Sequence, residues 1–187
     1  DGSILFTLNR RYGNQKAVVG KLDKNGNLVW CKVINTSRAF AGTTPHEQPQ
    51  LLTDGNLVFL SINIPTEFSR STANIMKLDP VNGGILWEKE IGGSDFSIKL
   101  TPLAIRNSQL YFNLHWTAYP IFWVEKRGRL TLDGNGNISN IVSFDLNNSP
   151  SNGRYNFFRN DPFLAMVYTQ DNRFGLMYVN EAGKVEW

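Results

Sequence analysis

Oxygen-bearing side chains stand at alternate positions in two short segments, which is the spacing that cation-binding loops use. The segments are Asp23-Lys24-Asn25-Gly26-Asn27 and Asp133-Gly134-Asn135-Gly136-Asn137. A twelve-residue calcium loop also needs glycine at its sixth position and glutamate at its twelfth, where the first segment has Leu28 and Ile34. Two related segments carry Val81 and Ala182 within the turn. We therefore predict that all four segments are hairpin turns without a bound metal.

The sequence contains no recognisable motif of a catalytic site. His46 and His115 stand far apart, and neither has Cys or carboxylate partners at ligand spacing. No nucleophile elbow, HExxH motif, phosphate-binding loop or pair of acids in a recognisable frame occurs. Cys31 is the only cysteine, which rules out an intramolecular disulfide, and we interpret it as a small core hydrophobe. We predict no catalytic residue, no metal ligand and no cofactor.

Arginine and aromatic residues gather in several polar segments, and this composition is typical of recognition surfaces. Such side chains stack on sugars or pair with acidic groups. The alternative is that some of these aromatics, such as Trp116, Phe122 and Trp123, pack beneath their own loops. The candidate binding residues are Arg11, Tyr12, His46, Arg70, Trp116, Tyr119, Arg154 and Tyr155.

Charge and hydropathy argue against a nucleic-acid partner and against a transmembrane segment. The chain of 187 residues has a formal net charge of +3, and its Lys and Arg residues are scattered rather than gathered. Nucleic-acid binding usually needs a basic face, so we expect no nucleic-acid partner. No apolar run reaches the roughly 18 to 20 residues of a membrane-spanning helix, so we expect no transmembrane segment.

A short sequence motif, which we call the phrase, occurs four times and determines the expected architecture. Its copies are KLDKNGNLVW (residues 21–30), KLDPVNGGILW (77–87), LTLDGNGNISN (130–140) and MYVNEAGKVEW (177–187). Each copy is an apolar run, a turn rich in Gly, Asn and Asp, and a second apolar run, which is typical of a β-hairpin. The copies recur about every 50 residues, a period that propeller blades show, and helical periodicity is missing. We predict an all-β propeller or propeller segment with blades at 1–34, 35–91, 92–144 and 145–187.

Four antiparallel strands are expected in each complete blade. In the second blade they are Gln50–Thr53, Leu57–Ile64, Ala73–Leu78 and Ile85–Ile91, and in the third Lys99–Ile105, Leu110–Trp116, Phe122–Leu132 and Ile138–Phe144. The first blade lacks its innermost strand, and the fourth stops just inside its outermost strand. These termini could pair in one closing blade; the favoured alternative is a piece of a larger propeller. The chain opens on Asp1 inside an expected strand, without a signal peptide, as an interior piece or a processed form would.

Two classes of connection separate the ends of the expected strands. The hairpin turns are short, whereas the other connections are long and varied. Those long connections are residues 9–16, 35–48, 65–72, 92–97 and 147–162. Variable loops on a rigid scaffold are the usual location of binding sites, so we expect a ligand or partner on the side of the long connections.

The phrase resembles a known repeat. Asp79, Gly83 and Trp87 reproduce the D-x3-G-x3-W core of the tryptophan-docking repeat of quinoprotein-like propellers, and Asp23, Gly26 and Trp30 follow it one residue shorter. In the third copy Asn140 replaces the Trp, and in the fourth Asn180 replaces the acid while Trp187 remains. The phrase is also similar to the DGN and LDxNGNxxW repeats of secreted bacterial surface propellers. The resemblance implies that Trp30, Trp87 and Trp187 dock between neighbouring blades.

The sequence and this resemblance together predict a non-catalytic binding or surface-assembly module. We expect it to be extracellular, on the cell surface or periplasmic, to form part of a longer chain or assembly, and to bind a protein or a carbohydrate. Two alternatives follow from the same superfamily. One is a quinoprotein-type oxidoreductase, which would bind pyrroloquinoline quinone and calcium in an eight-bladed ring; this chain, with four units and one cysteine, departs from that pattern. The other is a propeller that scaffolds envelope assembly.

Overall fold

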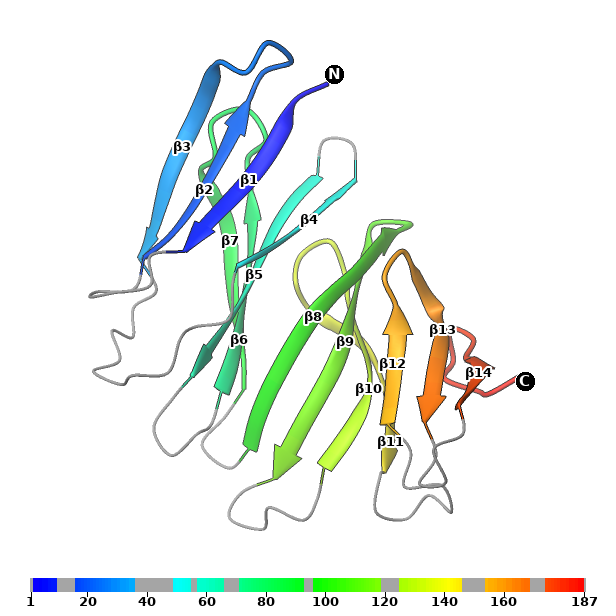
Figure 1. Cartoon of the computed structure of the whole chain (residues 1–187). Coiled ribbons are helices and arrows are strands. Elements are labelled where there is room, and N and C mark those ends of the chain that lie inside the picture. The colour runs from blue at the N-terminus through cyan, green and yellow to red at the C-terminus, as the bar shows by residue number, and fades with distance from the viewer. Residues whose placement is uncertain are drawn as a thin grey trace. The chain divides into compact units, whose positions relative to one another are not determined.

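The computed structural model describes residues 2–9, 16–35, 49–54, 57–65, 71–92, 96–118, 125–145, 154–168 and 174–186 (Figure 1). These residues form 14 strands in four antiparallel sheets, and the described part of the chain contains no helix. The chain divides into two compact units, Asp1–Ile91 and Gly92–Trp187. None of the described residues belongs to a helix long and apolar enough to cross a membrane.

Unit 1 contains two sheets. The first has three strands in the order β1 (Ile4–Asn9), β2 (Lys16–Leu22) and β3 (Leu28–Asn35). The second has four, in the order β4 (Gln50–Asp54), β5 (Leu57–Pro65), β6 (Ser71–Leu78) and β7 (Ile85–Ile91). Within each sheet, every strand pairs antiparallel with the next strand of that sheet along the chain, so each sheet is a meander.

Unit 2 also contains a four-stranded and a three-stranded meander, in the opposite order along the chain. One sheet has β8 (Phe96–Arg106), β9 (Gln109–Ala118), β10 (Glu125–Leu132) and β11 (Ile138–Asp145) as neighbours in chain order. The other has β12 (Arg154–Phe158), β13 (Asp161–Tyr168) and β14 (Phe174–Tyr178). After β14 the chain turns back at Asn180–Lys184, and a single bridge joins Val179 to Val185.

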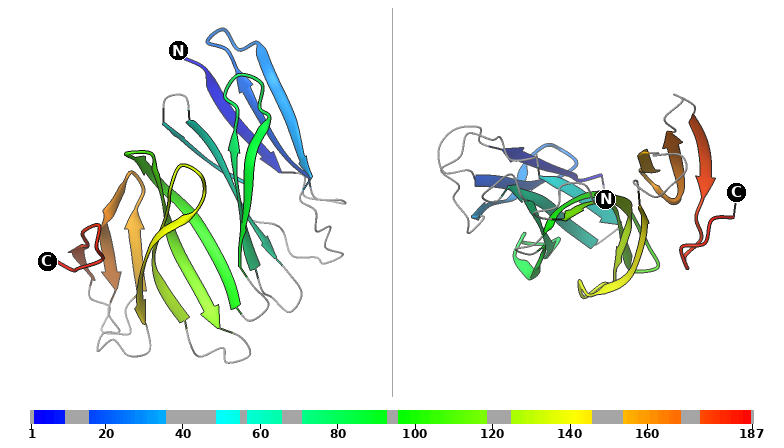
Figure 2. Two further views of the ribbon diagram at one scale, coloured as in Figure 1. Left: turned by 180° about the vertical axis from the view of Figure 1, so that it is seen from behind. Right: turned by 90° about the horizontal axis from the view of Figure 1, so that it is seen from below.

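Each three-stranded sheet lies beside the four-stranded sheet of its own unit (Figure 2), and alternating side chains of the two sheets form a shared core. In unit 1, Ala17, Val19 and Ile34 of sheet β1–β3 share a core with Leu60 and Met76 of sheet β4–β7. The equivalent core of unit 2 is formed by Leu103, Tyr111 and Val142 of sheet β8–β11 with Phe163, Ala165, Met177 and other residues of sheet β12–β14. Both cores follow the period-2 pattern in which alternate residues of a strand face the same side.

The recurring phrase forms the hairpins β2–β3, β6–β7 and β10–β11 and the turn after β14, as the sequence predicts. Gly26, Gly83, Gly136 and Gly183 stand at equivalent points of these turns and have φ between 72° and 85°. Glycine adopts this left-handed backbone at no steric cost because it has no Cβ, so it favours the turn at these positions. In the three hairpins the strand register shifts next to the turn, between Lys21 and Leu22 for example, where Lys21 pairs with Trp30 and Leu22 pairs with Leu28.

Most strand limits agree with the sequence predictions to within a few residues, and two interpretations were wrong. The connection 147–162 is not one loop, because β12 lies within it and the chain turns again at Arg159–Asn160. Asn160 has φ of 70°, so an asparagine supplies the tight turn where the sequence offered no glycine. Cys31 is exposed rather than a core residue, because it alternates with the buried Trp30 and points to the other face of β3.

Candidate functional site

The strands of each sheet end on two opposite sides of the sheet. We call these two sides edges, meaning the rows of strand ends and not the outermost strands, and we name them by their connections. The turn edge carries the short hairpin turns, and the loop edge is where the longer connections attach. In sheet β8–β11 the loop edge consists of the start of β8, the end of β9, the start of β10 and the end of β11. The strand ends at the loop edges belong to the residues that the structure describes, whereas most of the connecting loops do not.

The predicted binding residues fall into three groups. Trp116 lies on β9 near the loop edge. Arg154 and Tyr155 are the first two residues of β12, opposite Tyr168 and Val167, and their side chains lie outside the described part. The remaining candidates lie outside the described residues altogether, and they are Arg11, Tyr12, His46, Arg70 and Tyr119.

Trp116 is the centre of a small aromatic and cationic cluster at the loop edge of sheet β8–β11. Its indole is half-buried, with the ring of Phe96 at 6.2 Å and tilted by 37°. The ammonium of Lys126 lies 5.7 Å from the indole centroid, because Lys126 stands directly opposite Trp116 on β10. A cation over an indole at an exposed site contributes about 0.5 to 1 kcal/mol. The cluster offers an aromatic surface and a positive charge, which suits a ligand with an apolar ring face and an acidic group.

Lys126 and Trp116 are held by regular strand pairing rather than by a loop. Phe96, Trp116 and Lys126 occur on three adjacent strands, β8, β9 and β10, which are paired along their whole length. The side chains of Trp116 and Leu114 share one face, and Leu114 is buried. A side chain anchored in this way keeps its orientation, which favours recognition because less rotamer freedom is lost on binding.

The turn acids accept hydrogen bonds from the backbone of their own turns. Asp23 Oδ1 accepts backbone N–H bonds from Asn25 at 2.8 Å and from Asn27 at 2.9 Å. Asp133 Oδ1 accepts the equivalent pair from Asn135 and Asn137, and Asp79 Oδ1 accepts one bond, from the N–H of Val81. These carboxylates satisfy backbone donors that a tight turn would leave unpaired.

The same hydrogen bonds explain the electrostatics of the first turn. The side-chain amide of Asn27 donates to Asp23 Oδ2 at 2.9 Å. This bond, with backbone donors behind it, lowers the pKa of Asp23 below its ordinary value, because all of them favour the ionised carboxylate. Within the described ranges no three His, Cys, Asp or Glu side chains gather closely enough to hold a metal ion. The prediction that no metal binds stays a prediction.

The predicted docking tryptophans have different surroundings. Trp30 is buried, and its indole Nε1 donates to the carbonyl of Pro80 in the β6–β7 turn at 3.2 Å. Its ring lies against Gly83, where an added Cβ would come within 2.5 Å of the indole. Trp87 is only half-buried and lies 5.8 Å from the ring of Phe59 on its own sheet. Trp187 lies outside the described residues.

Unit 2 makes the corresponding contact with different residues. Asn140, which replaces the repeat Trp, donates its side-chain amide to the carbonyl of Glu181 at 2.6 Å. Glu181 follows Asn180 as Pro80 follows Asp79, so the accepting carbonyl occupies the same place in the turn. Val142 fills the space above Gly183, since an added Cβ there would lie 2.8 Å from a Val142 methyl. The contact between neighbouring sheets is therefore kept although the indole is lost.

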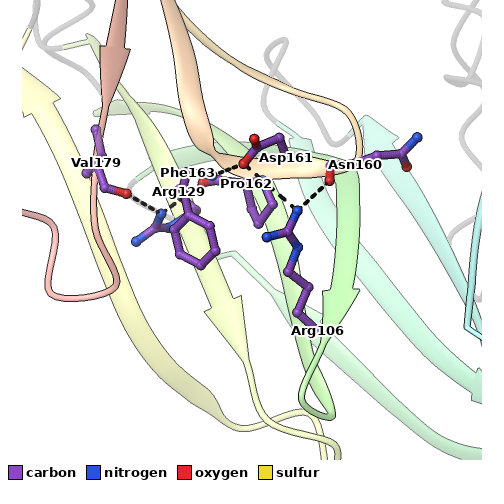
Figure 3. Close-up of polar contacts among 7 residues, drawn as sticks. All are labelled: Arg106, Arg129, Asn160, Asp161, Pro162, Phe163 and Val179. Atoms are coloured by element: carbon purple, nitrogen blue, oxygen red, sulfur yellow. Dashed lines mark hydrogen bonds and ion pairs between the residues drawn. The ribbon is translucent and has the colours of Figure 1, made fainter. Parts of the chain in front are cut away.

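Arg129 is the main residue that sequence reasoning missed (Figure 3). It is fully buried on β10 and donates to four backbone carbonyls of the facing sheet and its turn. Nη1 bonds the carbonyls of Pro162 at 2.8 Å and Val179 at 3.2 Å, and Nη2 bonds those of Asn180 at 2.7 Å and Glu181 at 3.3 Å. The guanidinium also lies over three aromatic rings, those of Phe163, Phe157 and Tyr111, at 5.0 to 5.8 Å.

These contacts assign Arg129 a structural role in joining two sheets. Burial lowers the pKa of Arg129, because an apolar environment disfavours its charged form. Burial likewise raises the pKa of the Tyr111 phenol, and the negative charge of Glu181 adds to that effect. The sequence signal was the position of Arg129, four residues before the turn acid Asp133, which is the place where unit 1 has the fully buried Val19.

Comparisons with known proteins add no family to this description. No protein-family model matches the sequence, and no match is found among the curated proteins. The resemblance of Asp79, Gly83 and Trp87 to tryptophan-docking repeats therefore stays a prediction.

Proposed function

We propose that this chain is a non-catalytic binding module made of propeller blades, acting outside the cytoplasm. Two features support the blade arrangement. Each unit packs one antiparallel meander on another, and an outer-strand side chain contacts the turn of the following sheet in both units, Trp30 on Pro80 and Asn140 on Glu181. Sheets that pack face to face in series, each as a four-stranded meander, are the building plan of propellers.

The observation that carries the binding role is the cluster of Phe96, Trp116 and Lys126 at a loop edge. Its half-buried indole and the adjacent ammonium are presented by paired strands, and the predicted binding residue Tyr119 follows β9 in sequence. The ligand chemistry that fits is a ring with an apolar face and a nearby carboxylate. Acidic carbohydrates and acidic, aromatic segments of proteins both provide it.

The turn edges are less suited than the loop edges to bind a ligand. Their acids and asparagines already bond to their own backbones, as Asp23 and Asp133 do. A ligand at a turn edge would have to displace those bonds, whereas a ligand at the loop edge would cover aromatic surface. We therefore place recognition at the loop edge, and extracellular or periplasmic sugars and proteins are the partners we propose.

A binding screen with paired variants tests this proposal. Oligosaccharides of uronic acids, neutral oligosaccharides of the same length and acidic aromatic peptides are titrated by calorimetry. We expect one acidic class to bind, and Trp116→Ala or Lys126→Met to weaken binding by about tenfold or more, the range for hot-spot residues. Lys184→Met is the matched control, because Lys184 is an exposed cation on a turn.

Two results would contradict the proposal. One is an equal loss of affinity in the Lys184→Met variant, which would indicate a general charge effect. The other is tight binding that survives both loop-edge changes while the melting temperature of each variant stays unchanged.

A further inference from the structure

We propose that the outer face of sheet β1–β3 is a docking surface for sheet β12–β14 of a second copy of this chain. The outer face of sheet β1–β3 is the face turned away from the unit 1 core. Its exposed or half-buried residues are Ile4, Phe6, Leu8, Val18, Cys31 and Val33. Strand register places them together, since Leu8 pairs with Val18 and Val18 pairs with Val33.

The turn beside this face has the two features that receive a docking side chain elsewhere in the molecule. In unit 1 the turn glycine Gly83 lies under the Trp30 ring, and the carbonyl of Pro80 accepts the indole N–H. In unit 2 Gly183 lies under Val142, and the carbonyl of Glu181 accepts the Asn140 amide. The β2–β3 turn has Gly26 and the carbonyl of Lys24 at the same places.

The place above Gly26 is open. A Cβ built on Gly26 would meet no heavy atom within 4 Å, in contrast to the close contacts at Gly83 and Gly183. Gly26 has φ of 85°, so its backbone has the same left-handed conformation as the two covered glycines. The β2–β3 turn thus has the same acceptor features, with an apolar sheet face beside it, and among the described residues no side chain covers Gly26.

The chain also carries the donor half of this contact. The outer face of sheet β12–β14, turned away from the unit 2 core, presents Phe174, Leu176 and Met166. In the sequence Trp187 follows Asn180 by the same spacing with which Trp30 follows Asp23. A second copy therefore supplies the apolar face and the indole that the open acceptor matches.

A contact between two different faces is heterologous, so it is satisfied either by a closed ring of copies or by an open chain of them. Cys31 stands opposite Gly20 on the outer face of sheet β1–β3, so docking of a second copy would cover it.

Sedimentation velocity over a range of concentrations tests the docking. The wild-type chain should sediment faster as its concentration rises. Leu8→Glu on the acceptor face and Leu176→Glu on the donor face should each weaken association more than about 30-fold, as expected for a charge at the centre of an apolar contact. Leu86→Glu is the matched control, because Leu86 is 57% exposed on β7, Leu8 is 58% exposed and Leu176 is 54% exposed.

Mixing the two variants gives the sharpest result. The Leu8→Glu chain keeps its donor face and the Leu176→Glu chain keeps its acceptor face, so an equimolar mixture should form pairs of two chains and stop there. Val33→Glu replaces Leu8→Glu if the latter melts at a lower temperature than the wild type. The reaction of Cys31 with a thiol reagent should also slow as the wild-type concentration rises.

Three outcomes would overturn the proposal. They are a wild-type chain that is monomeric at every concentration, a mixture of the two variants that stays monomeric, and a Leu86→Glu variant that loses association as completely as Leu8→Glu. Trp187→Ala separates the indole from the apolar face: docking as proposed requires weaker association in this variant, and unchanged association would contradict the role of the indole.

Discussion

At the scale of single residues, Arg129 makes a set of buried hydrogen bonds whose contribution to stability can be measured. Arg129→Met should lower the free energy of unfolding by about 3 kcal/mol, because a buried carbonyl left without a donor costs roughly 1 to 3 kcal/mol and relaxation recovers part of the loss. The carbonyls of Pro162 and Val179 lose the donor that Arg129 provides. Those of Asn180 and Glu181 lose one of two donors, because they also accept the Gly183 N–H and the Asn140 amide. Urea unfolding measures the change.

Arg159→Met is the control for that experiment, since Arg159 is exposed in the β12–β13 turn. An exposed substitution normally changes stability by less than about 0.5 kcal/mol. Equal effects of the two substitutions would show that the buried hydrogen bonds of Arg129 contribute nothing beyond the loss of a positive charge.

Asp23 gives a prediction about pH. Its pKa is below the ordinary value of 3.8 in the folded chain, so folding favours the ionised form. The resulting stabilisation is present above the unfolded pKa and is lost as pH falls through the lower folded pKa. Asp23→Asn removes this pH-dependent part while keeping a side-chain oxygen, as Asn180 does when it accepts the Lys184 N–H.

The melting temperature of Asp23→Asn should therefore lie below that of the wild type near pH 7, and the two should converge as pH falls below about 4. Thermal unfolding followed by circular dichroism at a series of pH values provides the measurement. A gap that stays constant between pH 7 and pH 2.5 would mean that ionisation of Asp23 is not what stabilises the turn.

The occupied carboxylates also lead to a prediction about calcium. Calcium needs six to eight oxygen ligands, whereas the Oδ1 atoms of Asp23 and Asp133 each accept two backbone N–H bonds. Calorimetric titration with calcium should give no heat, and a chelator should leave the melting temperature unchanged. A rise of several degrees with calcium would show that the turns reorganise around the metal.

At the scale of elements, the contact of an outer strand with the next turn should differ in strength between the two units. Trp30→Ala should cost about 3 to 5 kcal/mol, the range for a buried large aromatic. Asn140→Ala should cost about 1 kcal/mol, since it removes one hydrogen bond from a half-buried side chain. Trp30→Phe keeps most of the apolar contact and loses the Nε1 bond to Pro80, so its effect should fall between the two. Urea unfolding of the three variants gives the order, and a reversed order would contradict the proposed equivalence.

The elements also show how far the sequence alone could lead. Glycine turns and alternating apolar runs predicted the hairpins of the phrase, because both signals are local. Strand β12 was missed, since its turn uses Asn160 rather than glycine. Arg129 was missed because an arginine within a strand is ordinarily a surface residue, and its burial depends on carbonyls contributed by a distant turn. Trp116 could be named from sequence, but its partners Phe96 and Lys126 are defined only by strand register.

At the scale of the whole molecule, the meander order predicts a gradient of backbone stability across each four-stranded sheet. The second and third strands bond to neighbours on both sides, while an outermost strand leaves every other backbone group facing outward. Burial follows the same order in unit 1, where nearly all side chains of β6 are buried and those of β7 are mostly exposed.

Hydrogen exchange followed by mass spectrometry should reveal this gradient as slow exchange in the inner strands and faster exchange in the outermost ones. Local opening requires less free energy where few buried contacts and few bonded neighbours hold a strand, so β7 should exchange faster than β6. Unit 2 is an internal replicate, because β11 is outermost beside β10 in the same meander order. Equal protection of β6 and β7 in unit 1, repeated for β10 and β11 in unit 2, would mean that the outermost strands are covered in solution by something other than this pairing.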